Sequence, residues 1–270
     1  MPKTNLLISI GLMIAMIGAT AAAEQNLCIS YYLTGTASDS SGNFKEAAIL
    51  LQKAADEACK NVRKAEALDG LGQAAIALGE FDKADQCLRD AYKLKKKSLG
   101  KRHREMATTI NNLADLNFLQ KKTEAECLYR RALEINRHDE TNLEVCRSLN
   151  GIALIKSAAD APVEAENLLL RAVQLHEKAQ RRHHPYLATN LTNLGILYTA
   201  QNRYPEAEQA LERARVIQDQ ALGECHPDVA VRLSAMAALC AATNRTAEAI
   251  CLAERAEEIR AKQRAVGNLY

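Results

Sequence analysis

The residues that could do chemistry in this chain are a few histidines and cysteines placed close together. His183 and His184 are adjacent, Cys225 precedes His226, and His103 lies in a basic segment. Imidazole and thiolate groups are common zinc ligands and common partners in nucleophilic catalysis. However, the chain shows no zinc spacing, no Ser-His-Asp order, no phosphate loop and no pair of carboxylates on one helical face. We therefore expect neither an enzyme nor a metal or cofactor site.

These side chains lie between amphipathic helices, as the stretch from His184 to Gln218 illustrates. Apolar residues recur at spacings of three and four in Pro185–Ala200 and again in Tyr204–Gln218, which is helical periodicity. A turn at residues 201–203 separates the two segments. Because neither apolar stripe can be buried by one helix alone, the stretch is expected to be one unit of a repeated array.

One alanine frame recurs through the chain roughly every 40 residues. An alanine is followed four positions later by a large residue and three positions after that by a second alanine, and in the last copy the middle residue is small. The copies are Ala47–Leu51–Ala54, Ala84–Leu88–Ala91, Ala125–Tyr129–Ala132, Ala165–Leu169–Ala172, Ala207–Leu211–Ala214 and Ala249–Ala253–Ala256.

A second helix precedes each of the last five copies. It carries a small residue where the two helices are expected to cross, at Gly72, Ala114, Ala153, Gly195 and Ala237. Small residues let helices approach closely, so the pattern predicts an all-α stack of antiparallel helix pairs.

The composition agrees with closely packed helices. Aromatic residues make up 4% of the 270 residues, there is no Trp, and only 5 prolines are present, which argues against a sandwich, a barrel or long linkers. The formal net charge of +2 is too small for a nucleic-acid-binding surface, so no nucleic acid partner is expected.

Residues 1–23 have the features of a secretory signal peptide. Lys3 precedes a short apolar run, and Ala21–Ala23 provide small residues before Glu24. An uncleaved membrane anchor is the alternative, although the run is short for a span of about 20 residues. We expect an exported protein, periplasmic or secreted, without stable membrane insertion after cleavage. Residues 24–43 would be an irregular segment or a degraded first helix, 44–264 the repeat domain, and 265–270 a tail.

The residues of the repeat resemble the pattern of a known family. Leu194-Gly195, Tyr198, Tyr204 and the frame from Ala207 to Ala214 look like the tetratricopeptide repeat pattern. The period and the connector at 222–230, which contains His226-Pro227, are similar to the kinesin light chain subtype. The resemblance implies a right-handed solenoid, and it makes the His-Pro connectors helix starts rather than ligands. Pro at the first helical position fits that role.

Two turns depart from the family pattern. Lys122 and Thr246 replace the aromatic residue found at Phe44, Phe81 and Tyr204, and the third turn is one residue shorter than its neighbours. Those turns are expected to be looser.

In this family the first helix of each pair lines a concave face that binds peptides or partner helices. The matching inward positions give a groove that is polar in the first three full repeats and apolar toward the C-terminus, where Ile196, Val231 and Ala238 occur. Amide side chains can donate to and accept from a peptide backbone, so Asn111 and Asn150, with Arg147, are the leading candidates. Solvation of a helix face is the alternative. The remaining polar candidates are Asp69, Gln73, Thr108, Asp115 and Thr192.

The carboxylate clamp of chaperone-binding relatives requires Lys, Asn and Arg at these positions. The chain has Asp69, Gln73, Asn111, Asp115 and Asn150 instead, so a chaperone-tail adaptor is not expected.

The eight cysteines are an even number, as suits an oxidising compartment. In the expected stack, Cys28 and Cys59 fall at the same end of a helical hairpin and could form a disulfide bond. Cys240 and Cys251 flank one turn and could also pair. Burial of several cysteines as small residues in place of alanine is the alternative.

These observations predict an exported, non-catalytic interaction scaffold that binds a protein or peptide in its concave groove. A second hypothesis is a structural or self-associating component of the cell envelope. It would use a basic edge formed by the segments around Lys95–Lys97 and Arg181–Arg182, although solvated helix ends are the simpler explanation of those charges.

Overall fold

The computed structural model describes residues 43–58, 61–139, 142–179 and 181–268. These residues form helices and, among themselves, no strand. The helices are α2 (Phe44–Asp56), α3 (Asn61–Leu78), α4 (Phe81–Leu99), α5 (Met106–Leu119), α6 (Ala125–Ile135), α7 (Leu143–Ala158), α8 (Pro162–Lys178), α9 (Pro185–Ala200), α10 (Tyr204–Ala221), α11 (Pro227–Ala242) and α12 (Thr246–Asn268). The predicted signal peptide, Cys28 and Cys59 lie outside the described residues.

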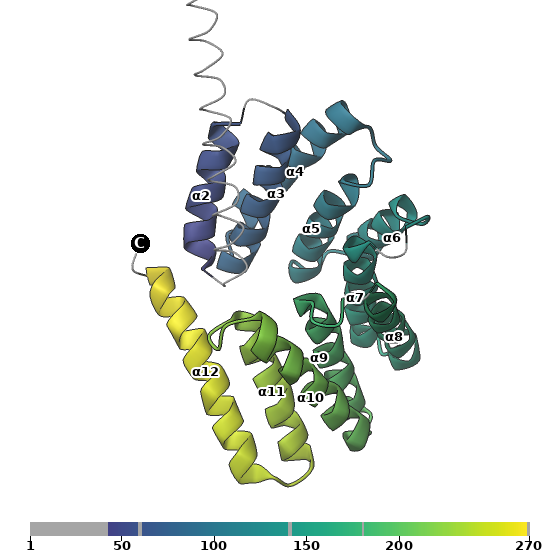
Figure 1. The fold of residues 1–270 in the computed structure, drawn as a ribbon, viewed down its shortest axis with the longest axis vertical. Coiled ribbons are helices and arrows are strands. Elements are labelled where there is room, and N and C mark those ends of the chain that lie inside the picture. The colour runs from purple at the N-terminus through teal and green to yellow at the C-terminus, as the bar shows by residue number, and fades with distance from the viewer. Residues whose placement is uncertain (1–42, 59–60, 140–141, 180, 269–270) are drawn as a thin grey trace, which may run out of the picture.

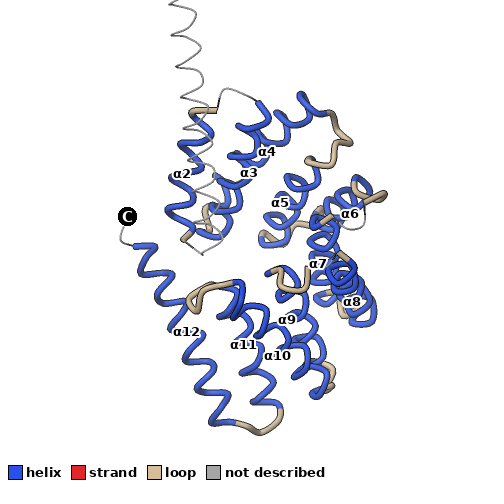
Figure 2. The backbone as a smooth tube through the Cα atoms, in the orientation of Figure 1, coloured by secondary structure: helices blue, strands red, loops and turns tan. Residues whose placement is uncertain are grey.

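The helices form a curved stack of hairpins joined by short loops (Figures 1 and 2). Consecutive odd-numbered helices from α3 to α11 contact one another, whereas consecutive even-numbered helices have few contacts or none within the described ranges. The closely spaced row must lie on the inside of the curve, so the odd-numbered helices form the concave wall. This is the all-α solenoid that the sequence predicts.

Large residues of the outer helices insert between the inner helices. A Cβ atom added at Gly72 would lie 2.5 Å from Leu88, and one at Gly195 would lie 2.5 Å from Leu211 within the same hairpin. A Cβ atom at Gly151 would overlap Tyr129, which belongs to the preceding hairpin. Middle residues of the alanine frame therefore pack within their own hairpin, as Leu88 and Leu211 do, or against the next hairpin, as Tyr129 does.

The first and last alanines of every copy of the frame are buried as expected. The last copy differs in its middle residue, because Ala253 is exposed. No further hairpin packs on α12 within the described residues, so a large residue at this position would have nothing to seat. Helix α12 continues to Asn268, and part of the expected tail is therefore helical.

Each hairpin turn contains one residue in the left-handed region. These residues are Gly79, Lys121, Asp160, Asn202 and Asn244, with φ between 56° and 78°. The turn between α5 and α6 differs from the others, because α6 begins at Ala125 itself rather than three residues before the frame alanine. At Thr246, α12 begins in the usual register.

The His-Pro connectors start helices, as the resemblance implies. The His184 Nδ1 atom accepts a hydrogen bond from the Tyr186 backbone N–H at 3.2 Å, and His226 Nδ1 accepts from Asp228 at 3.1 Å. Both histidines are N-caps followed by Pro at the first helical position. None of the helices in the described ranges is both long and apolar enough to cross a membrane.

Candidate binding pocket on the concave face

The inner helices α5, α7 and α9 form one pocket that contains three of the expected concave-face residues. Asp115 of α5, Arg147 and Asn150 of α7 and Thr189 of α9 line a cavity of about 180 Å³. Cys146, Tyr186 and Asn190 complete its walls. The pocket lies in the middle of the concave wall, where three hairpins meet.

Arg147 is fixed in place by partners on two helices. Its guanidinium donates to Asp115 at 2.7 Å and to Asn112 at 2.8 Å on α5, and to Glu144 at 3.3 Å on its own helix. It also lies over the Tyr186 ring, 5.7 Å from the ring centre. Burial by itself would lower the pKa of Arg147, but Tyr186, Glu144 and Asp115 outweigh burial and raise it. The side chain is therefore a permanently charged, rigid part of the pocket wall.

Asp115 is shared between Arg147 and a core tyrosine. One carboxylate oxygen accepts from Tyr129 Oη at 2.5 Å and the other accepts from Arg147. Burial and the Asp115 carboxylate raise the pKa of Tyr129, which therefore stays a neutral donor. The side chain of Asp115 remains 38% exposed, so it can accept further hydrogen bonds.

Two asparagines of α9 differ in how far their hydrogen bonds are satisfied. Asn193 donates to the Asn150 Oδ1 atom at 2.7 Å and so joins α9 to α7. Asn190 lines the pocket and is 2% exposed, yet its Nδ2 atom has no hydrogen-bond partner among the described residues. A buried amide donor without an acceptor is unusual.

The prediction that Asn111 lines the groove is wrong, because its side chain is fully buried. Its amide donates to the Glu144 carboxylate at 2.7 Å and to the Glu144 carbonyl at 3.0 Å, and it accepts from Ser148 at 2.7 Å. Asn111 therefore joins α5 to α7 beneath the surface, and its hydrogen-bonding groups are occupied.

Asp69 and Thr192 are also buried rather than presented to a ligand. Asp69 accepts from Lys95 at 2.5 Å and from Thr109 at 2.8 Å, and burial raises its pKa. This pair corrects a second expectation, because Lys95 was assigned to the basic edge and instead is 3% exposed inside the stack.

Gln73 and Thr108 lie on the concave wall, half-buried, and link neighbouring helices. Gln73 donates to Asn112 at 2.9 Å, and Thr108 donates to Glu144 at 3.2 Å. Toward the C-terminus the face becomes apolar as expected, with Ile196 and Val231 about half exposed.

The sequence interpretation missed Asn112, Glu144, Tyr186, Asn190 and Asn193. The side chains of Asn112 and Asn193 lie one residue beyond the inward positions that the resemblance supplied, at equivalent places in two repeats. That repetition of Asn was the signal in the sequence that could have identified these two residues. Nothing in the sequence distinguishes Asn190, which follows Thr189.

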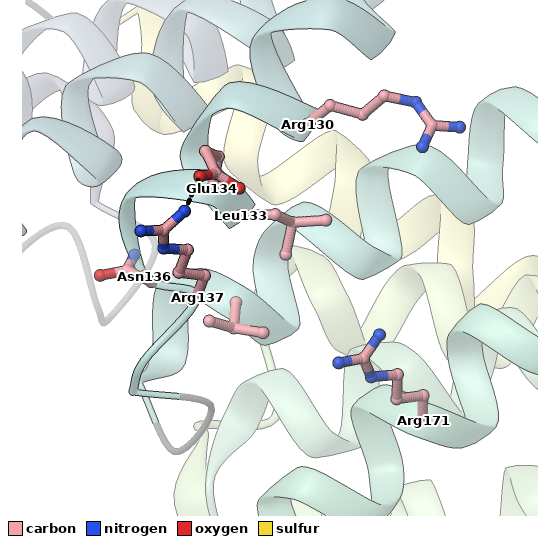
Figure 3. A pocket seen from close by; sticks show the side chains of 7 residues that line it. Arg130, Leu133, Glu134, Asn136, Arg137 and Arg171 are labelled. Carbon is pink, nitrogen blue, oxygen red and sulfur yellow. Dashed lines mark hydrogen bonds and ion pairs between the residues drawn. The ribbon is translucent and has the colours of Figure 1, made fainter. Parts of the chain in front are cut away.

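A second pocket of about 310 Å³ lies outside the concave wall, among α6, α7 and α8. Figure 3 shows its arginines, Arg130, Arg137 and Arg171, around Leu133. Arg137 pairs with Glu134 at 2.7 Å and Arg130 with Glu126 at 2.6 Å, and these exposed pairs offset much of the positive charge. We therefore regard the concave pocket as the stronger candidate.

Neither a Cys240–Cys251 disulfide bond nor a metal-binding cluster is present among the described residues. Cys240 and Cys251 are free thiols, the first buried and the second exposed, so the suggested pairing across the turn is wrong. No group of His, Cys, Asp and Glu among these residues is placed to hold a metal ion.

Comparison with known proteins agrees with the repeat fold. The family model described as tetratricopeptide repeat matches residues 63–138 and 144–215. No curated protein matches the chain. Similar solved structures include BtubC (BKLC) from P. vanneervenii, with 20% identity, 92% of this chain and 94% of that chain covered, and a TM-score of 0.58.

Two further structures share the fold. The TPR-like repeats of a kinesin light chain-like protein of Podosopora anserina are 22% identical, with 76% of this chain and 98% of that chain covered and a TM-score of 0.53. The Rap conjugation gene regulator of plasmid pLS20, in complex with the Phr* peptide, is 16% identical, with 90% and 65% covered and a TM-score of 0.68.

Proposed function

Because this chain belongs to the tetratricopeptide repeat family, whose model matches more than half of it, we propose that it is a non-catalytic scaffold that binds a protein or peptide on its concave face. The observation that carries the proposal is the pocket between α5, α7 and α9. Its polar groups come from three consecutive hairpins. A ligand bound there would contact three successive repeats rather than one helix.

The pocket is prepared for binding before a ligand arrives. Arg147 and Asn150 are already held by hydrogen bonds to neighbouring helices, so little side-chain entropy remains to be lost on binding. The apolar surface at Ile196 and Val231 lies farther along the same wall. An extended ligand would thus meet a polar site first and an apolar strip next. The Rap regulator, with the same fold, was solved with a peptide, which supports a peptide ligand here.

Crosslinking in intact cells tests the proposal, with Asn150→Ala combined with Tyr186→Ala in the pocket. These side chains are half-buried and 37% exposed, so the fold should survive their loss. The control is Val163→Ala combined with Leu170→Ala, two exposed residues of α8. We expect the pocket variant to lose the partners that wild type and the control retain. An unchanged set of partners would rule out the concave site.

We also propose that the protein acts after export, in the periplasm or outside the cell, on the basis of residues 1–23. Mass spectrometry of the mature protein should find an N-terminus near Glu24. A Lys3→Glu variant with two leucines of the apolar run changed to aspartate should retain its full length. Recovery of uncleaved wild-type chain from the cytosol would contradict export.

A further inference from the structure

We propose that the pocket between α5, α7 and α9 receives an uncharged carboxamide side chain, Gln or Asn, of the bound peptide. This inference rests on the proposed function, because it names what the concave site recognises. It is argued from the hydrogen-bonding groups, the charges and the size of the pocket.

The pocket offers one donor that no other described residue satisfies. Asn190 Nδ2 is buried in the pocket wall and has no acceptor within the described ranges. Elsewhere on this wall, Asn193 donates to Asn150 and Gln73 donates to Asn112. Asn112 Nδ2 is also buried without a partner among the described residues, but Asn112 does not line this pocket. A ligand oxygen placed at Asn190 would therefore accept the hydrogen bond that this buried donor lacks. Such a bond favours binding more than one that only replaces a hydrogen bond to water.

The pocket also offers an acceptor. Each Asp115 oxygen accepts one hydrogen bond from within the protein, from Tyr129 or from Arg147. A carboxylate has about four acceptor positions, and Asp115 is partly exposed. A ligand N–H group can therefore be accepted by Asp115 while a ligand oxygen is held by Asn190.

The charges disfavour an ionised side chain. A carboxylate could accept from Asn190, but it would share the pocket with the Asp115 carboxylate, and Arg147 is already paired with Asp115 and Glu144. An ammonium group could donate to Asp115, but it has no acceptor for Asn190 and would approach the Arg147 guanidinium. A carboxamide carries its donor and its acceptor on two separate atoms of one small neutral group, whereas a hydroxyl has both on a single oxygen atom.

The size fits one side chain. Small-molecule sites usually have volumes of about 300 Å³ or more, whereas this pocket has about 180 Å³. The Tyr186 ring and the buried Cys146 give it partly apolar walls, which suit the methylene groups of Gln.

A peptide-library experiment tests the assignment. The probe is a set of N-acetylated, C-amidated octapeptide mixtures, each with one fixed residue (Gln, Asn, Glu, Lys, Leu or Ala) at a chosen position. Each mixture is passed over the purified, immobilised chain, and retained peptides are quantified by mass spectrometry. At one position we expect Gln or Asn to be retained about fivefold better than Glu, Lys or Leu, equivalent to about 1 kcal/mol.

Two variants and one matched control identify the residue responsible. Asn190→Ala should lose the preference, and Asn190→Asp, which replaces the donor by an acceptor, should shift it toward Lys. The control is Asn136→Ala. Asn136 is 3% exposed and its Nδ2 atom also has no partner in the described part of the chain, but it lines the outer pocket. Circular dichroism confirms that each variant is folded.

The outcomes separate the two proposals. If wild type retains none of the mixtures, peptide binding on the concave face is contradicted. If peptides are retained without a preference for Gln or Asn, as recognition of the peptide backbone alone would give, only the carboxamide site is overturned. A preference that survives in Asn190→Ala, or disappears in Asn136→Ala, would overturn it as well.

Discussion

Individual residues in this array can be compared at equivalent places in successive repeats. Lys95 Nζ donates to the carbonyl of Glu105 at 3.0 Å, and Gln218 Nε2 donates to the carbonyl of Asp228 at 3.2 Å. His176 lies in the same register and is fully buried, but neither ring nitrogen has a hydrogen-bond partner among the described residues. It stacks instead on His184, 5.8 Å between ring centres.

The buried imidazole should make the fold sensitive to acid. Burial, with His184 and Arg181, lowers the pKa of His176 from 6.5 to about 4. Between these values the unfolded chain binds the proton and the native chain does not, so stability falls as the pH drops through this window. We expect His176 to account for a loss on the order of 2 to 3 kcal/mol between pH 7 and pH 4.

Urea unfolding of wild type and His176→Gln at pH 7 and pH 4.5 measures this loss. The glutamine imitates Gln218 and does not titrate, so the variant should lose less stability on acidification. His183→Gln, at an exposed position, is the control and should behave like wild type. Equal pH dependence of wild type and His176→Gln would contradict the assignment. His184 adds to the effect in the same direction, because burial and Arg181 lower its pKa too.

Arg147 should matter for stability as well as for the pocket. Arg147→Leu leaves Asp115 and Glu144 without their shared cation in a place where the arginine side chain is only 10% exposed. Removing one partner of such a buried pair is expected to destabilise the protein by about 3 kcal/mol.

The matched control for Arg147 is Arg130→Leu. Arg130 pairs with Glu126 at 2.6 Å, but its side chain is 62% exposed. A loss of about 0.5 kcal/mol or less is expected there. Thermal unfolding of the two variants compares them directly, and similar losses would mean that the Arg147 network is not buried enough to matter.

At the scale of the helices, close approach at glycine determines how a hairpin closes. Gly195→Ala would place a methyl group 2.5 Å from Leu211 Cγ. The gain in helix propensity, about 1 kcal/mol, is smaller than the overpacking. We expect a net loss of about 1 to 2 kcal/mol in denaturant unfolding. Gly223→Ala is the control, since nothing lies within 4 Å of its added Cβ; a neutral Gly195→Ala would show that α9 and α10 can separate without penalty.

The hairpin turns offer a substitution that should stabilise the protein rather than destabilise it. Lys121 has a φ of 56°, where a side chain with a Cβ atom is strained, and it occupies the place of Gly79. Lys121→Gly should therefore stabilise the protein by about 0.5 to 1 kcal/mol, measured by the midpoint of urea unfolding. Asn202→Gly should gain less, because Asn tolerates this conformation. A destabilised Lys121→Gly would indicate that the lysine side chain makes a compensating contact.

For the whole molecule, stability should depend on position along the stack. Each hairpin contacts mainly its neighbours, so the central helices are supported from both sides and the terminal ones from one. Ala253 is exposed on α12 for this reason. Native-state hydrogen exchange should find the strongest protection in α7 and α9 and the weakest in α12. Uniform protection would mean that the array opens only as a unit.

The sequence alone determined the hairpins, and the tertiary structure decided which inward residues a ligand can reach. Helix α9 begins and ends where its apolar periodicity places it, and the frame alanines are buried, because these contacts form within a hairpin or with the next one. The exposure of Asn111, Asp69 and Asn190 depends instead on the rise and rotation between successive hairpins. That geometry covers Asn111 and Asp69, and it brings Asn190 beside Asp115 and Arg147 in one pocket. Periodicity records which face of a helix points inward, but not how much of that face the neighbouring helix covers.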